Sequence, residues 1–232
     1  MSNHWRLAFM FDAPNGKFSG LEERLRRCAK RIVDTVGDGN VRLGVADMHP
    51  DLAFLRQHGD TKLHTVDAAV EVSVAASRVR DLPSIAKSLR EPLSGLWHPS
   101  TLEVMTGPIF PIVPVRDGGV FLSLAFKRYP GTTSEQFRGW WLHQHSKIAT
   151  PILGDGLLAY DQVHVDHSVS DAVANAFGVE TVQYDAYDNL TWTDRDAFLK
   201  SISDAAAMAT IYADEVGRID DPSRRSAIMR RL

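Results

Sequence analysis

One order of elements occurs twice along the chain, and this repeat most constrains the possible fold. Hydrophobic patterns predict a strand, a helix, two strands, a helix and a strand in residues 1–116 and again in residues 117–232. The best linker between the halves is Asp117-Gly118-Gly119, because consecutive glycines favour a turn. Identity between the halves is slight, so the repeat rests on element order. We expect an α+β fold built from two similar units.

The individual elements follow from periodicity and from turn residues. In the first half we predict strands at residues 5–11, 41–48 and 68–76, helices at 21–36 and 81–96, and an extended segment at 101–114. The prolines of this last segment favour a sheet edge or a crossover. In the second half we predict strands at 120–127, 157–166 and 180–187, helices at 133–151, 171–176 and 194–213, and a short final strand.

The strand predicted at 157–166 has an unusual polar row. Side chains alternate between the two faces of a strand, so one face presents Tyr160, Gln162, His164 and Asp166. The other face presents Ala159, Val163 and Val165, with Asp161 as its one polar residue. We expect a helix to cover the apolar face. The polar row would then face solvent or a shared cavity, and its residue types favour the cavity.

The helix predicted at 133–151 precedes this strand. Thr133 or Ser134 can cap its first turn, with Glu135 and Gln136 placed for a capping box. Its apolar stripe consists of Phe137, Trp140, Trp141 and Ile148. His145 follows Trp141 by four residues and therefore projects from the same side. His143 is turned about 200° away from His145, which predicts that it is exposed.

These two segments resemble the EthD domain family. The matching residues are Phe126, Lys127, Arg128, Pro130 and Gly131, then Phe137, Arg138, Trp140, Trp141, His145, Ile148 and Ala149, then Gly156, Leu157, Tyr160, Gln162, His164 and Val165. The family usually has Asn before the second His, where this chain has Val163.

The resemblance implies ferredoxin-like β-α-β-β-α-β units that pair sheet to sheet as a dimeric α+β barrel. Two units fused in one chain would form a pseudo-dimeric barrel. The first half has no Trp-Trp pair and no His at the matching place. We therefore expect residues 1–116 to be a degenerate, architectural unit and residues 117–232 to carry the site.

Two histidines are the leading catalytic candidates. His145 and His164 can exchange protons near neutral pH, which suits general acid–base catalysis. The alternatives are a helix-end histidine for His145 and a cavity-lining residue without chemistry for His164. Asp185 could orient a histidine, act as a base, or be an ordinary salt-bridged acid.

The predicted substrate contacts are Tyr160, Gln162, Trp141, Tyr187 and Gln183. Tyr160 and Gln162 can hydrogen-bond a carbonyl or phenol oxygen. Trp141 can form the floor under an aromatic ring or belong to the core. At the end of the strand before the helix, Lys127 and Arg128 could clamp an anion or simply be solvated.

Composition and motifs exclude several classes of function. A net charge of −3 gives no basic surface for nucleic acid, and no apolar run approaches the roughly 18 residues of a membrane span. Cys28 is alone, so neither a disulfide framework nor a Cys-based zinc site can form within the chain. Nucleotide-binding glycine motifs and G-x-S-x-G are absent. The N-terminus lacks signal-peptide character, and we expect a cytoplasmic protein.

We expect neither a metal nor another cofactor. His143 and His145 are two residues apart on a helix and so diverge, and Asp166 and His167 point to opposite faces of a strand. Haem remains an alternative, because some relatives of this barrel class bind it through a histidine.

The leading functional hypothesis is a cofactor-independent lyase, dehydratase or cyclase acting on a hydrophobic aromatic or polyketide-like carbonyl compound. The alternatives are a small-molecule-binding or accessory protein of a degradation pathway and a cofactor-free monooxygenase. Exposed sheet edges make a homodimer a further expectation.

Overall fold

The computed structural model describes residues 2–14, 18–36, 40–56, 64–114, 118–180 and 182–232. Their strands are β1 (His4–Phe11), β2 (Asn40–Ala46), β3 (His64–Thr65), β4 (Ala68–Ala75), β5 (Glu103–Val113), β6 (Val120–Arg128), β7 (Leu157–His164), β8 (Ala186–Trp192) and β9 (Ile219–Arg231). Their helices are α1 (Leu21–Val36), η2 (Pro50–Arg56), η3 (Ala76–Asp81), α2 (Leu82–Leu89), α3 (Ser134–Trp140), η4 (Trp141–His145), α4 (Ser146–Leu153), α5 (His167–Phe177), α6 (Arg195–Ser201) and α7 (Ala205–Glu215).

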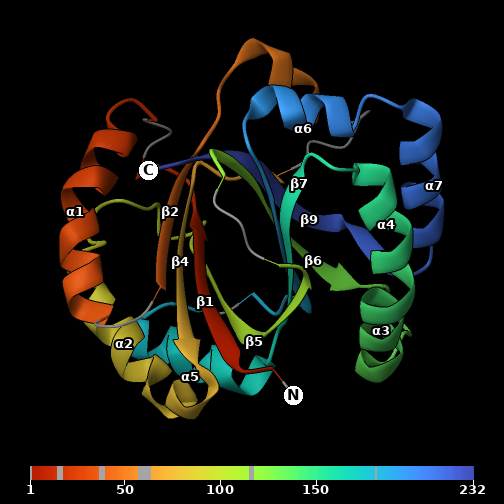
Figure 1. Cartoon of the computed structure of the whole chain (residues 1–232). Helices are drawn as coiled ribbons and strands as arrows, with labels where there is room; N and C mark the ends of the chain where they lie inside the picture. Colours follow the sequence, from red (N-terminus) through yellow and green to blue (C-terminus); the bar gives the residue numbers. More distant parts are fainter. Residues whose placement is uncertain (1, 15–17, 37–39, 57–63, 115–117, 181) are drawn as a thin grey trace.

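The strands form one closed barrel (Figure 1). Their order is β2-β4-β1-β5-β7-β8-β6-β9, β2 pairs with β9 to close the ring, and β3 adds to β9. Each half has the order of a ferredoxin-like unit, β5-β1-β4-β2 in the first and β9-β6-β8-β7 in the second. The predicted α+β fold of two fused ferredoxin-like units in a pseudo-dimeric barrel is therefore confirmed. Because the ring closes, the expected homodimer would need a surface other than an open edge of these eight strands.

The halves meet closely at β5 and β7. A Cβ atom on Gly107 would lie 2.1 Å from the carbonyl oxygen of His164, so only glycine allows the backbones to approach this far. The prediction of an edge or crossover at 101–114 is wrong, because β5 pairs with β1 on one side and β7 on the other. A register shift between Pro111 and Val113 accommodates a proline inside the sheet.

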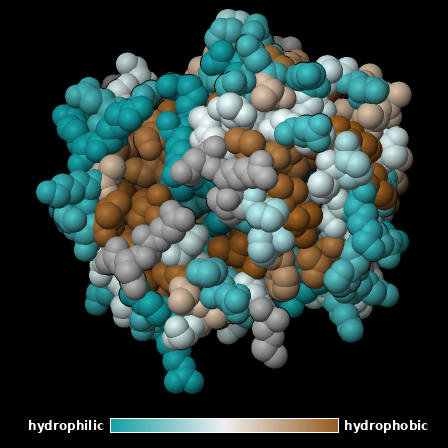
Figure 2. Space-filling view, in the orientation of Figure 1, coloured by the Kyte–Doolittle hydropathy of each residue, from teal (hydrophilic) through white to brown (hydrophobic). Residues whose placement is uncertain are grey.

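Two helix layers cover the outside of the barrel (Figure 1). α1, α2 and α5 pack on the first half, and α3, η4, α4, α6 and α7 on the second. α1 is amphipathic, with hydrophilic residues outward and apolar residues toward the strands (Figure 2). α5 belongs to the second half in sequence, yet its Phe177 packs against Phe9 of β1, with ring centroids 4.9 Å apart. The two units thus interlock. Among the described helices, none has the length and apolar composition to span a bilayer.

Three predicted elements of the second half differ in the structure. β8 begins at Ala186, whereas the prediction placed it at residues 180–187. The helix predicted at 194–213 is two helices, and Asp204 separates them by capping α7 through the backbone N–H groups of Ala206 and Ala207. The final strand is long, since β9 has 13 residues. Its pairing with β6 and β2 closes the barrel, a long-range contact that local patterns do not reveal.

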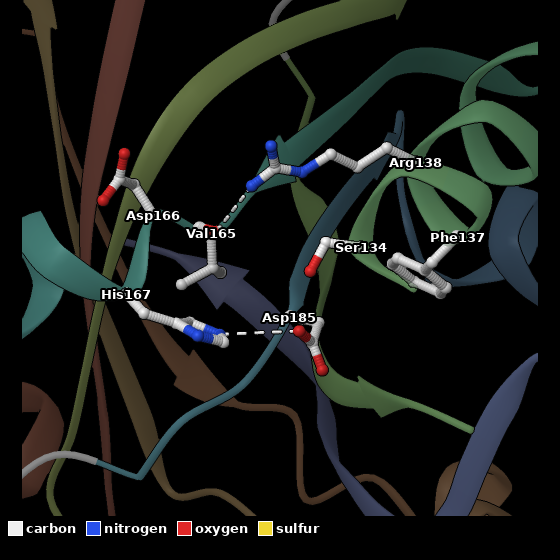
Figure 3. A pocket seen from close by; sticks show the side chains of 7 residues that line it. All are labelled: Ser134, Phe137, Arg138, Val165, Asp166, His167 and Asp185. Carbon is white, nitrogen blue, oxygen red and sulfur yellow. Dashed lines mark hydrogen bonds and ion pairs between the residues drawn. The ribbon is translucent and has the colours of Figure 1, made fainter. Parts of the chain in front are cut away.

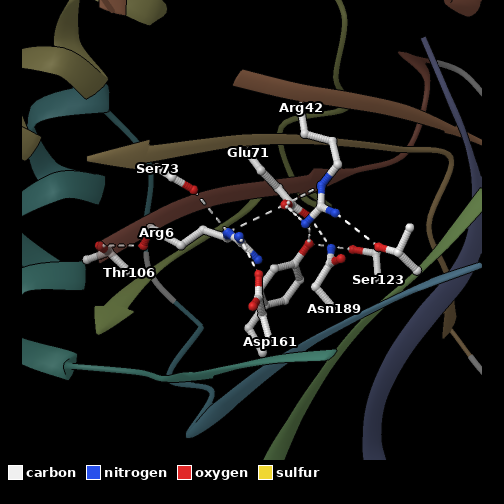
Figure 4. Close-up of polar contacts among 10 residues, drawn as sticks. Arg6, Arg42, Glu71, Ser73, Thr106, Ser123, Asp161 and Asn189 are labelled. Atoms are coloured by element: carbon white, nitrogen blue, oxygen red, sulfur yellow. Dashed lines mark hydrogen bonds and ion pairs between the residues drawn. The ribbon is translucent and has the colours of Figure 1, made fainter. Parts of the chain in front are cut away.

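The barrel interior contains an apolar layer and a buried ion-pair network (Figure 4). Arg6 of β1 lies 2.8 Å from Asp161 of β7 and 3.6 Å from Glu71 of β4. Arg42 of β2 contacts the same Glu71 oxygen at 2.6 Å. Tyr187 and Asn189 of β8 donate hydrogen bonds to the other oxygen of Glu71. The network therefore connects strands of both halves and gives Asp161 a partner.

Glu71 is the centre of this network. Burial by itself raises the pKa of its carboxyl, but Arg42 and Arg6 outweigh burial and lower the pKa below the ordinary 4.5. A carboxylate whose pKa is lower in the folded state stabilises the fold above its unfolded pKa. That stabilisation is lost as the pH falls through the folded pKa.

We predict that Glu71→Gln destabilises the protein by about 3–5 kcal/mol at pH 7, because it leaves Arg42 without its carboxylate and Arg6 with Asp161 alone. Urea denaturation measures the change. Glu91→Gln is the control, since its pair with Arg31 is exposed and should matter little. The difference between Glu71→Gln and the wild type should shrink below about pH 4.5. Equal effects of the two substitutions at pH 7 would contradict this assignment.

Candidate active site

The polar row of β7 faces the helices. The ring of His164 stacks on Trp141, with centroids 4.8 Å apart, and Gln162 donates hydrogen bonds to the Trp141 carbonyl and the Tyr160 hydroxyl, both at 3.0 Å. Asp161 and Val163 face the barrel interior instead. The prediction that a helix covers the apolar face is wrong, because the interior of a closed barrel takes that face. The fourth member of the row, Asp166, lies beyond β7.

His145 lies on a π-helical turn. α3, η4 and α4 form one continuous helical segment, in which η4 spans Trp141–His145. The segment begins with the predicted capping box, formed by Thr133 and Gln136. Trp141 and His145 are both buried, whereas His143 is exposed as predicted. Single π-helical turns are frequent at functional sites because they change the direction of side chains within a helix.

Two acids from α7 hold His145. Its Nδ1 lies 2.9 Å from Oδ2 of Asp214, and its Nε2 lies 3.8 Å from Oε1 of Glu215. Asp214 also accepts a hydrogen bond from the indole N–H of Trp140 at 3.2 Å. A carboxylate beside Nδ1 favours the tautomer with the proton on Nδ1, which leaves Nε2 free to accept a proton.

A buried acid of β8 lies in the same layer. Asp188 is 5% exposed, and its Oδ1 has no hydrogen-bond partner among the described residues. Burial and the nearby charge of Glu215 raise the pKa of Asp188 well above its ordinary 3.8, although Arg224 and the Tyr160 hydroxyl oppose them. Arg224 itself pairs with Glu215 at 2.6 Å. The Asp188 carboxyl is thereby favoured in its neutral form.

His164 ends this set of polar groups. Its Nε2 lies 3.3 Å from Oε1 of Gln162, and its ring lies between Trp141 and Phe110. Burial, followed by the charges of Arg138 and His143, lowers the pKa of His164 to about 3. His164 is therefore a neutral imidazole near pH 7 and is unsuited to the role of a cationic acid.

A polar chain runs from one predicted histidine to the other, between helix and sheet. Its members in order are His145, Glu215, Asp188, Tyr160, Gln162 and His164. Hydrogen bonds join the last four, whereas Glu215 lies 3.8 Å from His145 and acts on Asp188 through its charge. Five of the predicted site residues therefore lie in one layer, namely His145, His164, Tyr160, Gln162 and Trp141. Asp188, Asp214, Glu215 and Arg224 were not predicted. If the strand predicted at 180–187 had been extended to Trp192, the alternation of its side chains would have identified Asp188 as a residue that faces the helices.

The other three predicted site residues lie elsewhere. Tyr187 points into the barrel and hydrogen-bonds Ser123 at 2.7 Å. Gln183 is exposed before β8. Asp185 accepts hydrogen bonds from the backbone and guanidinium of Arg128 and lies 3.5 Å from Nε2 of His167. Gln183 and Asp185 therefore precede β8, which begins only at Ala186.

A cavity of about 150 Å³ opens at the start of α3 (Figure 3). The lining residues are Ser134, Phe137, Arg138, Val165, Asp166, His167 and Asp185. The ring of Phe137 lies 5.6 Å from Trp141, which stacks on His164. The cavity is therefore separated from the end of the polar chain by aromatic rings.

The residues that the structure describes form neither a metal site nor a haem site. In the described part of the chain, no group of three or more His, Cys, Asp or Glu side chains could hold a metal ion. Trp140 packs against the ring of His145, and Trp141 stacks on the ring of His164. The adjacent cavity is much smaller than a haem, so this arrangement does not fit that group.

Comparisons with known proteins agree with this description. Residues 129–222 match the family model described as EthD domain, which confirms the resemblance inferred from the motif residues. Among curated proteins, none matches the sequence.

Solved structures share the fold over the whole chain. A candidate monooxygenase from Lactobacillus acidophilus NCFM is 11% identical, with a TM-score of 0.53 over 100% of this chain and 94% of that chain. An anthrone oxidase-like protein is 8% identical, with a TM-score of 0.57 over 100% and 92%. A mutant chlorite dismutase from Candidatus Nitrospira defluvii, in complex with cyanide, is 11% identical, with a TM-score of 0.55 over 100% and 91%. At such identities the likeness shows the fold alone.

His164 should make the folded protein sensitive to acid. Below about pH 6.5 the unfolded chain protonates this imidazole, while the folded protein resists protonation until about pH 3. Between these pH values the wild type should lose up to about 1.4 kcal/mol of stability for each unit by which the pH falls. We predict that His164→Gln does not show this loss, because glutamine does not titrate. Urea denaturation at pH 4.5 and pH 7 compares the variant with the wild type. An NMR titration of His164 near pH 6.5 would overturn the prediction.

Asp188 should have the opposite dependence on pH. The raised pKa of its carboxyl means that the folded state keeps a proton which the unfolded state loses above about pH 3.8, so stability falls as the pH rises. We predict that Asp188→Asn is more stable than the wild type at pH 7, with a gap that grows by up to about 1.4 kcal/mol per pH unit from pH 4. Urea denaturation between pH 4 and pH 8 tests this. If the stability difference between Asp188→Asn and the wild type did not change with pH, Asp188 would be ionised in the folded protein.

Proposed function

Because residues 129–222 are an EthD domain within this two-unit barrel, we propose that the chain is an acid–base enzyme acting on a small hydrophobic, carbonyl-bearing compound. The observation that carries the proposal is the polar chain between η4 and β7. It combines a carboxylate-oriented histidine with a carboxylic acid that its surroundings keep neutral. Environments that favour a base at one position and an acid at another are typical of acid–base catalysis.

His145 is the proposed base. Its Nε2 removes a proton from the carbon next to the substrate carbonyl, and the electron pair of that C–H bond moves onto the carbonyl oxygen. Asp214 stabilises the imidazolium that forms, because its carboxylate lies at Nδ1. Tyr160 is the proposed hydrogen-bond donor to the enolate oxygen; its buried hydroxyl hydrogen-bonds Gln162 and Asp188 in the free protein.

Asp188 is the proposed acid. In a dehydration the enolate electron pair re-forms the carbonyl, a C=C bond forms beside it, and the C–O bond to the hydroxyl on the next carbon breaks. Asp188 gives its proton to that leaving oxygen, and water departs. We propose that the proton on His145 then returns to Asp188 by way of Glu215, which lies 3.8 Å from Nε2 of His145 and whose charge acts on Asp188, so both groups recover their starting state. In this scheme Asp188 replaces Asp185 and the second histidine as the proton donor. His164 remains neutral and holds Gln162 and Trp141 in place.

Oxidation by O₂ is a second candidate function. It begins with the same proton removal, since an enolate or phenolate can react with O₂ where its parent compound does not. The descriptions of two structural neighbours, a candidate monooxygenase and an anthrone oxidase-like protein, support this alternative. Consumption of O₂ distinguishes oxidation from a lyase reaction.

Hydrogen–deuterium exchange tests the shared first step. A thermal-shift screen of aromatic and polyketide-like ketones selects a ligand, and NMR in D₂O follows exchange at the carbon beside its carbonyl. We predict that His145→Ala slows exchange by about 10²–10⁴-fold, because it removes the base. His143→Ala is the matched control, being exposed on the same helix. Asp188→Asn should retain exchange but lose elimination.

The possible outcomes separate the candidates. Exchange by His145→Ala at the wild-type rate would refute His145 as the base. A ligand that binds the wild type without any exchange would indicate a binding or accessory protein. Exchange accompanied by O₂ uptake would favour the oxidative reaction.

A further inference from the structure

We infer that Arg224 of β9 is a positioning residue, which directs one oxygen of Glu215 toward His145 and balances the charge of the buried acids there. This role rests on the proposed function only for the reaction that the acids serve. The contacts and the charges themselves can be tested without a substrate.

β9 is irregular at the point where it carries this residue. The pairing of β9 with β6 shifts between Ala125 and Lys127, so that Phe126 alone faces residues 221–224 of β9. Bulges of this kind change the direction of side chains and are frequent beside active sites. The guanidinium of Arg224 lies over the ring of Phe126, 5.9 Å from its centroid, on the side of the sheet that the helices cover.

Two carboxylates fix the guanidinium of Arg224. Its Nη2 lies 2.6 Å from Oε2 of Glu215, and its Nε lies 2.6 Å from Oδ1 of Asp221. The side chain of Asp221 is 77% exposed, so this second pair adds little stability and serves mainly to orient the group. Because the donors of a guanidinium lie in one rigid plane, two such partners determine its orientation.

The two oxygens of Glu215 face different partners. Oε2 accepts from Arg224, whereas Oε1 lies 3.8 Å from Nε2 of His145. A carboxylate is planar, so the pair with Arg224 also determines the direction of Oε1. Glu215 is the last residue of α7, and the next residues, Val216 and Gly217, are exposed. Without Arg224 the carboxylate could therefore turn away from His145 toward solvent.

The charge of Arg224 also acts on Asp188. Burial, followed by the charge of Glu215, raises the pKa of the Asp188 carboxyl, whereas Arg224 and the Tyr160 hydroxyl lower it. Arg224 thus keeps this pKa below the value that burial and Glu215 alone would set, so that Asp188 gives up its proton more readily. In the part of the chain that the structure describes, Tyr212 of α7 is a further titratable group that the charge of Arg224 affects.

Carbon-13 NMR titration of the Asp188 and Glu215 carboxyl groups tests this role on the full chain. Because these groups interact, their titration belongs to the pair. We expect Arg224→Gln to raise the pH at which the pair releases its last proton by about 1–3 units, since the nearby positive charge is lost. Arg224→Lys keeps the charge and should reverse most of this shift. Arg230→Gln is the matched control on the same strand, because the pair of Arg230 with Glu22 is exposed and lies elsewhere.

The imidazole of His145 provides a second measurement. At pH 7 its NMR signals should change in Arg224→Gln, because Oε1 of Glu215 leaves Nε2, and should stay unchanged in Arg230→Gln. Melting curves identify the variants that fold. If Arg224→Gln does not fold, Arg224→Met replaces it, since methionine keeps an apolar stem over Phe126, and the same two changes are expected.

The outcomes separate a positioning role from a merely structural ion pair. A folded charge-free variant with the carboxyl titration and the His145 signals of the wild type would overturn the inference, even if that variant were less stable. The proposed function would survive that result, because it is judged by deuterium exchange on a ketone. Conversely, a shifted titration together with a wild type that exchanges no ketone would sustain the arrangement of the acids and refute the proposed function.

Discussion

Closure of the barrel is the constraint on which the rest of the structure depends. The pairings β5–β7 and β2–β9 join two ferredoxin-like sheets into one ring and create an interior that neither sheet has alone. Each strand must then place one face inside and the other under a helix layer. For β7 this sends Val163 inward and leaves Tyr160, Gln162 and His164 beneath the helices, where polar groups must find partners in the protein.

The same closure explains the charges at the centre of the barrel. Arg6, Glu71 and Arg42 come from the first half, whereas Asp161 and Asn189 come from the second. A buried network of this kind adds little net stability compared with apolar packing, but removal of one member is costly. Its value lies in specificity, because a shift of one residue in any of these strands would separate the charges.

The sequence predicts those features of the fold and the site that depend on neighbouring residues in the chain. Repeated element order indicates the two-unit fold, the capping box at Thr133 marks the start of α3, and the motif around His145 and His164 identifies the layer of the candidate site. Contacts between distant segments were not predictable. The acids that hold His145 lie on α7, and the length of β9 follows from its pairing with β2 and β6. Asp188 was missed because the strand predicted at 180–187 ends one residue before it, whereas β8 runs from Ala186 to Trp192.

A comparison of the two halves supports a single site. Within each unit β2 corresponds to β7, and β4 corresponds to β8. Helix-facing positions in the first half hold Leu43 and Val45 on β2 and Val70, Val72 and Val74 on β4. In the second half these places hold the Tyr160–Gln162–His164 row and Asp188. Apolar side chains there need no partners and give the first half a dry core. Apart from the network inside the barrel, the buried ionisable groups of these strands therefore lie in the helix-covered layer of the second half, which is expected when such groups are retained for chemistry rather than for stability.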